Sequence, residues 1–183
     1  MKVRCAMMLC VVFLVMASGC TTVDDAAVDE RNVGTIAGDK KIVTIILKRF
    51  LEDDIVKVLD ISPECYYGRV YLVGEYDTSS QKKQAIKIAK GVTGVRSVTT
   101  HLLPKKNNDS CGTTDNLEIT AKIKMLLIKD ADIWSTNVQV KTVQCNVVLL
   151  GIVESNVEIL KAIAYAKAVA GVRSVTSFIK TPQ

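Results

Sequence analysis

The chain has few side chains whose type and spacing could support catalysis or metal binding. Its six cysteines form no C-x-x-C pair and its one histidine is His101, so we predict no zinc site and no cofactor. An acidic or apolar residue follows Gly74 and Gly151, which does not fit a phosphate-binding loop. No serine, histidine and aspartate are ordered as a triad, and His101 fits a strand residue better than a general base. The sequence therefore predicts a protein that is not an enzyme, with no catalytic residues and no metal site.

A position with a clear chemical role lies near the N-terminus. Two basic residues precede an apolar run, residues 6–16, that is too short to span a bilayer and is typical of a cleaved export signal. Ala17-Ser18-Gly19-Cys20 then resembles the lipobox of bacterial lipoproteins, with alanine where leucine is commonest. The resemblance implies that residues 1–19 are removed and that Cys20 is acylated, which anchors the chain to a membrane. Thr21 in place of aspartate implies the periplasmic face of the outer membrane; the alternative is an ordinary signal peptide.

The remaining cysteines leave the disulfide pattern open. Once the signal is removed and Cys20 is acylated, three are left: Cys65, Cys111 and Cys145. Three thiols allow at most one intramolecular disulfide, and the exported compartment permits it. We expect Cys65 and Cys145 to be partly buried in strand regions, and no pairing is favoured over the others.

The charge balance argues against a nucleic-acid partner. The formal net charge is +5, with 24 basic and 19 acidic residues, and aromatic residues make up 5% of the chain. Nucleic-acid grooves combine basic clusters with stacking aromatics, and no such combination occurs here.

A candidate lipid-binding surface falls on the predicted helix that begins near residue 116. Ile119, Ile123 and Leu127 have helical spacing and should face the core. The other face and the residues after it combine lysines, which attract anionic headgroups, with apolar side chains that can enter the acyl boundary. These lipid-binding candidates are Lys122, Met125, Lys129 and Trp134. The alternative is a solvated helix with a partly buried tryptophan, and Glu118 interrupts the basic face.

These candidates belong to the second copy of an internal repeat. Gly94-Val95-Arg96-Ser97-Val98-Thr99 recurs 77 positions later as Gly171-Val172-Arg173-Ser174-Val175-Thr176, and many apolar positions recur at the same offset without a gap. A small domain of about 65 residues is close to the lower limit of independent stability, so we expect the two copies to support each other. We place a flexible tether at residues 20–38, the first domain at 39–103, a linker at 104–115 and the second domain at 116–180.

Each copy should fold as helix, strand, strand, helix, strand. The first helices have an apolar stripe, extended segments follow near 57–65 and 134–143, and short apolar strands follow at 69–73 and 146–150. Capping boxes begin the second helices at Thr78-x-x-Gln81 and Ser155-x-x-Glu158, and Gly94 and Gly171 should end them. Closing strands are expected at 95–103 and 172–179. The fold class is α+β, with two helices on one face of a three-stranded mixed sheet in each copy.

Two further expectations concern surfaces. Arg96 and Arg173 are retained in both copies and could bind an anion, but we expect each to lie on the solvent face of its strand. The first helix is apolar nearly all round because Val43, Ile45 and Leu47 add to its core stripe. Such a helix usually contacts something beyond its own sheet. We therefore expect the first domain to dock through this helix onto the second, and the second to meet the membrane.

This organisation resembles the BON domain of bacterial envelope proteins. The resemblance rests on Leu72-Val73-Gly74, the capped alanine-rich helix and Gly94–Val98, all of which recur in the second copy. The lipobox, tether and tandem domains resemble the dual-BON outer-membrane lipoproteins. The resemblance implies a non-enzymatic periplasmic protein that binds anionic phospholipid and supports envelope integrity. The alternative is a tethered adaptor that binds another envelope protein, with lipid contact only through its anchor.

Overall fold

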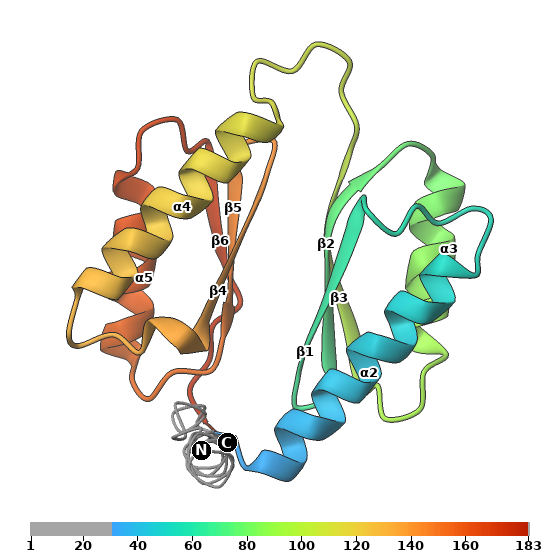
Figure 1. Cartoon of the computed structure of the whole chain (residues 1–183), viewed down its shortest axis with the longest axis horizontal. Coiled ribbons are helices and arrows are strands. Elements are labelled where there is room, and N and C mark those ends of the chain that lie inside the picture. The colour runs from blue at the N-terminus through green and yellow to red at the C-terminus, as the bar shows by residue number, and fades with distance from the viewer. Residues whose placement is uncertain (1–30, 183) are drawn as a thin grey trace, which may run out of the picture.

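The computed structural model describes residues 31–182, which form two copies of the same α+β unit. Each unit carries two helices on one face of a three-stranded sheet, and the opposite faces of the two sheets lie against each other (Figure 1). The helices therefore form the two outer layers of the molecule. The predicted fold class and element order are confirmed. None of the helices within residues 31–182 has the length and apolar character needed to cross a membrane.

The first unit places its central strand between an antiparallel and a parallel neighbour. Its elements are α2 (Val33–Leu51), β1 (Ile61–Tyr66), β2 (Arg69–Tyr76), α3 (Ser79–Lys90) and β3 (Ser97–Pro104). The sheet order is β1-β2-β3, with β1 antiparallel and β3 parallel to β2. In this register Val70 lies opposite Cys65 on one side and Val98 on the other.

The second unit repeats this topology. Its elements are α4 (Thr113–Lys129), the 3-10 turn η1 (Ser135–Asn137), β4 (Val138–Val143), β5 (Asn146–Gly151), α5 (Asn156–Ala168) and β6 (Ser174–Ser177). Its sheet order is β4-β5-β6, again antiparallel and then parallel. η1 lies within the segment near 134–143 that was expected to be extended, so that expectation is wrong for Ser135–Asn137.

Each unit has its own apolar core between helices and sheet. The inward stripes are almost fully buried: Ile46 and Phe50 on α2 are 0% and 1% exposed, and Ile123 and Leu127 on α4 match them. The second helices contribute alanines that are 0% exposed and let each helix approach its sheet closely; they are Ala85, Ala89, Ala162 and Ala166. Burying each large apolar side chain contributes about 1.5–3 kcal/mol.

The caps of the second helices follow the predicted pattern with one difference. The Ser155 hydroxyl accepts the Glu158 N–H at 3.3 Å, and the Glu158 carboxylate accepts the Ser155 N–H at 3.1 Å, which completes a capping box. In the first unit the Thr78 hydroxyl accepts the Gln81 N–H, but the Gln81 side chain accepts the N–H of Asp77 instead. In the first unit the Gln81 side chain therefore bonds the N–H one residue before the N-cap, Asp77, instead of the N–H of the N-cap residue Thr78.

The glycines expected to end these helices have another task. The helices end earlier, at Lys90 and Ala168. Gly94 and Gly171 adopt φ of +93° and +89° in the turns that lead into β3 and β6, a conformation that favours glycine. An added Cβ at Gly94 would also lie 3.3 Å from Ile42 on α2. The prediction that these glycines end the helices is wrong, because the chain needs a separate tight turn between helix and strand.

The two units meet through their sheets. A third apolar cluster joins Tyr71 and Val73 of β2 to Val148 and Leu150 of β5, and Val143 of β4 completes its buried part. The Tyr71 ring also packs against Phe178, with ring centroids 5.2 Å apart. This interface confirms that the units support each other.

The prediction that the first helix mediates this docking is wrong. α2 packs mainly on β1 and α3 of its own unit. Val43 and Ile45 are partly buried against the core of that unit, which explains why the helix is apolar on more than one side.

The helix starts also differ from the expected boundaries. α2 begins at Val33, within the predicted tether, because the Asn32 side chain accepts the Thr35 N–H at 2.8 Å and caps the helix. α4 begins at Thr113, within the predicted linker. Cys20 and the predicted signal segment lie outside the described residues.

Candidate functional site

The predicted lipid-binding residues lie on the outer surface of the second unit. Lys122, Met125 and Lys129 are exposed along one side of α4, and Trp134 is 46% exposed in the loop that follows it. Ile128, which was not among the predicted lipid-binding residues, is also on α4 and is 70% exposed. The signal was available, because Ile119, Ile123 and Leu127 take the inward positions and leave Ile128 outside. The structure therefore adds an apolar side chain to this surface.

Local ion pairs alter the charge of this surface. Lys122 is paired with Glu118 at 2.5 Å, so it offers less net charge than the sequence pattern implied. Lys129 makes no ion pair within residues 31–182. Lys129 is thus the stronger candidate for an external anion.

The acidic loop after α4 is partly neutralised within the second unit. Lys161 contacts Asp130 at 3.1 Å and Asp132 at 2.6 Å. A hydrogen bond from the Tyr165 hydroxyl, together with Lys161, holds the pKa of Asp130 below its usual range. These carboxylates therefore repel an anionic partner less than their number suggests.

Trp134 lies in a loop that is held to the second unit at Ile133 and at the Trp134 backbone. Ile133 is buried in the core of the second unit, and the Trp134 backbone N–H donates to Glu158 at 3.3 Å. Glu158 is itself 5% exposed and belongs to the capping box of α5. The burial of Ile133 and this hydrogen bond consequently hold the Trp134 side chain at the surface.

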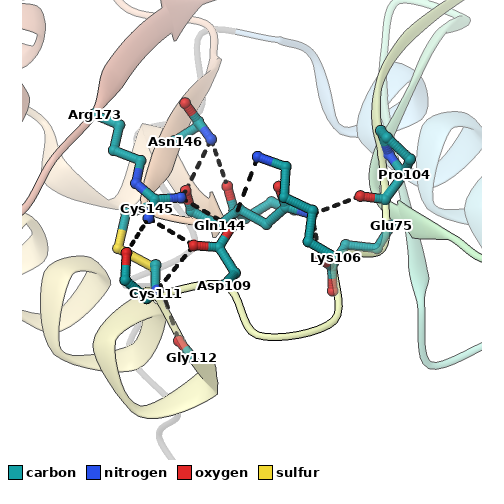
Figure 2. Close-up of polar contacts among 12 residues, drawn as sticks. Glu75, Pro104, Lys106, Asp109, Cys111, Gly112, Gln144, Cys145, Asn146 and Arg173 are labelled. Carbon is teal, nitrogen blue, oxygen red and sulfur yellow. Dashed lines mark hydrogen bonds and ion pairs between the residues drawn. A yellow bond between two sulfur atoms is a disulfide. The ribbon is translucent and has the colours of Figure 1, made fainter.

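A second cluster of polar groups surrounds Arg173 (Figure 2). The Arg173 guanidinium donates to both carboxylate oxygens of Asp109, at 2.6 and 2.9 Å, and to the Ser110 hydroxyl at 2.7 Å. These contacts, with the Cys111 N–H, hold the pKa of Asp109 down at about 2. Arg96 and Arg173 are both exposed, as predicted, but each lies one residue before its closing strand, so the prediction that they belong to the strand face is wrong. Arg173 is in addition bound by the linker.

A disulfide lies beside this arginine. Cys111 and Cys145 are bonded, with their Cα atoms 5.8 Å apart, and Cys65 is a free, buried thiol. The bond ties the start of α4 to the turn between β4 and β5. The sequence left this pairing open, and the structure selects one of the three.

The corresponding place in the first unit uses a buried carboxylate. Asp39 on α2 is 4% exposed and accepts the backbone N–H groups of Tyr67 and Gly68, each at 2.8 Å. Arg31 pairs with the same carboxylate, and the Cys65 thiol donates to it at 3.1 Å. Burial, with the nearby carboxylate, raises the pKa of the Cys65 thiol, so this cysteine is not a reactive thiolate. Sequence reasoning missed Asp39.

Polar contacts also cross between the units at the edge of the apolar interface. The Gln144 amide donates to Glu75 and to the Pro104 carbonyl, both at 2.8 Å (Figure 2). Lys141 pairs with Glu64 at 2.9 Å. These bonds fix the register of one sheet on the other.

His101 behaves as a strand residue. It lies in β3 opposite Val73, on the face that turns toward the second unit. Its buried Nε2 has no hydrogen-bond partner among the described residues, and burial lowers its pKa. His101 is therefore a strand residue, as predicted.

Comparison with known proteins gives a consistent assignment. The BON domain model matches residues 38–103 and again residues 115–183. The chain is 34% identical over 151 residues to osmotically-inducible protein Y of Escherichia coli strain K12, covering 81% of this chain and 75% of that protein. It is 27% identical over 155 residues to the outer membrane lipoprotein DolP of Haemophilus influenzae, covering 84% and 80%. A solved structure of CdsD, a structural protein of the type III secretion system of Chlamydia trachomatis, aligns with a TM-score of 0.33 and 14% identity over 79% of this chain and 63% of that one.

Proposed function

Because the chain belongs to the BON-domain family, we propose that it is a lipid-anchored, non-enzymatic protein of the bacterial envelope that binds anionic phospholipid through its second unit. The likeness to an outer membrane lipoprotein supports an envelope location. The lipobox-like Cys20 supports an anchor in the outer membrane, from which the units face the periplasm.

The observation that carries the lipid proposal is the composition of the exposed α4 surface. Met125 and Ile128 of α4 are 50% and 70% exposed, and Trp134 in the loop after α4 is 46% exposed. Lys129, the last residue of α4, makes no ion pair in residues 31–182. Apolar side chains flanked by lysines suit the boundary between headgroups and acyl chains. We name Met125, Ile128, Lys129 and Trp134 the α4 surface, with Lys122 at its margin.

The arrangement of the chain supports this assignment. The start of α2 and the loop after α4 both lie in the lower half of the view, on the side of the molecule away from the linker (Figure 1). The predicted anchor at Cys20 precedes Arg31 by only 11 residues. A tether of that length would hold this side, and with it the α4 surface, near the membrane.

The test is vesicle binding by residues 21–183, which retain every described helix and strand but lack the acylated cysteine. We expect salt-sensitive binding to vesicles that contain phosphatidylglycerol or cardiolipin, and little binding to neutral vesicles. Lys122→Glu with Lys129→Glu should weaken binding at least about tenfold, since each lysine near an anionic surface contributes about 1 kcal/mol and each glutamate adds repulsion. Trp134→Ala should weaken binding at low and at high salt.

A matched control carries the same charge change on the first unit. Lys83→Glu with Lys90→Glu alters two exposed lysines of α3, on the opposite outer layer, and should leave binding close to that of the parent. Equal loss in both double variants would mean that only net charge matters and would reject the α4 surface. No binding to any vesicle would favour the tethered protein adaptor instead.

A further inference from the structure

The two units contain equivalent surface grooves that differ in what fills them. In each unit the groove lies between the first helix, the turn joining the first two strands, and the turn that leads into the closing strand. The groove of the first unit has a volume of about 530 Å³ and contains Arg96; that of the second has about 280 Å³ and contains Arg173. Arg96 and Arg173 occupy the same place in the repeat.

In the second unit the linker of the chain itself lines the groove and binds its arginine. Asp109 and Ser110 of the linker bind the Arg173 guanidinium through three hydrogen bonds of 2.6–2.9 Å (Figure 2). The disulfide between Cys111 and Cys145 holds this segment in place. A bidentate pair between a guanidinium and a carboxylate is among the stronger and more geometrically specific polar contacts in proteins.

The chain takes another path in the first unit. Counted along the repeat, α2 begins about one turn earlier than α4. Residues 33–35, which correspond to the linker residues 110–112, are therefore helical in the first unit. Arg31, just before α2, lies toward β1, where it donates to the Cys65 carbonyl at 3.3 Å and stacks over the Tyr66 ring at 4.8 Å. No carboxylate of residues 31–182 reaches the Arg96 guanidinium, and Arg96 stays exposed.

We propose that the open groove at Arg96 binds an acidic segment of another protein, with an aspartate on the Arg96 guanidinium in the way that Asp109 binds Arg173. The surrounding side chains suit a peptide that carries a carboxylate and a hydroxyl. Lys41 adds a second cation, Ile42 supplies an apolar floor, and Thr35 and Thr93 supply hydroxyls. The Asp39 carboxylate also lines the groove, but it is 4% exposed and already bound by Arg31 and two backbone N–H groups. This function is separate from lipid binding by the α4 surface and gives the protein a second kind of partner.

A peptide fits the groove better than a lipid headgroup for a structural reason. The occupant seen in the equivalent groove is a main-chain segment, in which the Asp109 carboxylate also accepts the Cys111 backbone N–H at 3.0 Å. Residues 109–111 therefore already display the charge sign and the hydroxyl neighbour of such a peptide, in a local turn.

The test uses the isotope-labelled full chain in detergent micelles and a synthetic peptide that copies residues 104–115 with Cys111→Ser, which prevents disulfide exchange. Addition of millimolar peptide should shift the amide resonances of Gly68, Gly94 and Arg96 in a saturable way. Arg96→Gln in the protein, or Asp109→Asn in the peptide, should weaken binding at least about tenfold, because each removes a charged hydrogen-bond partner. Arg96→Glu should recover binding with an Asp109→Lys peptide.

Controls separate this site from the rest of the surface. Lys83→Gln removes one positive charge on α3 and should leave the peptide affinity unchanged, as should Lys129→Gln on α4. The proposal is overturned if Arg96→Gln binds the peptide as well as the parent chain, or if no resonance near Arg96 shifts. Shifts at Arg96 with short-chain phosphatidylglycerol but not with peptide would also overturn it, and would assign the groove to a phosphate headgroup. Lys122→Glu with Lys129→Glu tests lipid binding by the α4 surface, whereas Arg96→Gln tests peptide binding in the groove. Either proposal can therefore fail while the other holds.

Discussion

Each unit ties the start of its first helix to the turn between its first two strands, and the two units do so with different chemistry. In the first unit Asp39 accepts the N–H groups of the turn at Tyr67 and Gly68. In the second, the disulfide from Cys111 holds Cys145, while Asn116, at the position of Asp39, accepts only the Cys145 N–H at 2.9 Å.

The turns differ in the same way. Gln144 and Cys145 both have positive φ, of 49° and 58°, and neither is a glycine. The turn of the first unit has a glycine, Gly68, at the second of these positions. Positive φ costs most residues about 1–2 kcal/mol each. A covalent bond thus accompanies the more strained turn, and a carboxylate serves the less strained one. Both units thus connect the first helix to the turn between the first two strands, the first through a carboxylate and the second through a disulfide.

The largest expected effect comes from removing the carboxylate of the first unit. Asp39→Ala leaves one buried and one partly buried backbone N–H group without an acceptor and deprives Arg31 of its carboxylate, so we expect a loss of about 3–5 kcal/mol. Urea unfolding followed by circular dichroism measures this loss. Asp39→Asn, which imitates Asn116, should lose less. A loss below about 1 kcal/mol in Asp39→Ala would show that the turn does not depend on this contact.

Breaking the disulfide should have the next largest effect. The bond closes a loop with a sequence separation of 34, for which loop entropy predicts about 3–4 kcal/mol of stabilisation. Cys111→Ser with Cys145→Ser should lower the free energy of unfolding by that amount, and reduction of the parent chain should do the same.

A glycine at the strained position sharpens this comparison. Cys111→Ser with Cys145→Gly should be about 1 kcal/mol more stable than the double serine variant, because glycine adopts positive φ without steric cost. If the two variants are equally stable, strain in this turn does not explain why the second unit carries the bond.

The smallest expected effect concerns the interface between the units and depends on pH. His101 lies on the face where the second unit has Phe178, and burial lowers its pKa from 6.5. The unfolded chain therefore binds a proton more readily, so stability is complete above pH 6.5 and decreases as pH falls below it, toward the folded-state pKa. His101→Phe should remove this decrease between pH 6.5 and 5. Parallel pH profiles in the variant and the parent would exclude His101 as its source.

Elements whose signals are local were predicted well. The stripes of Ile46 and Phe50 and the capping residues Thr78 and Ser155 lie within a few positions of the structure they specify. Helix ends were placed less well: Gly94 was read as a helix end, although the chain turns once more before it. Ile128 shows that even a local pattern is incomplete when only the charged positions of a face are considered.

The sequence by itself determined the duplication, the α+β unit, the inward stripes and the exposed lysines of α4, because periodicity and caps act between near neighbours. Only the tertiary structure decided which cysteines pair, that the sheets and not α2 join the units, and that Arg173 is occupied while Arg96 is open. Those outcomes depend on distances between residues that lie tens of positions apart. Such distances are set by the packing of whole elements, so two nearly identical sequence motifs can have different partners.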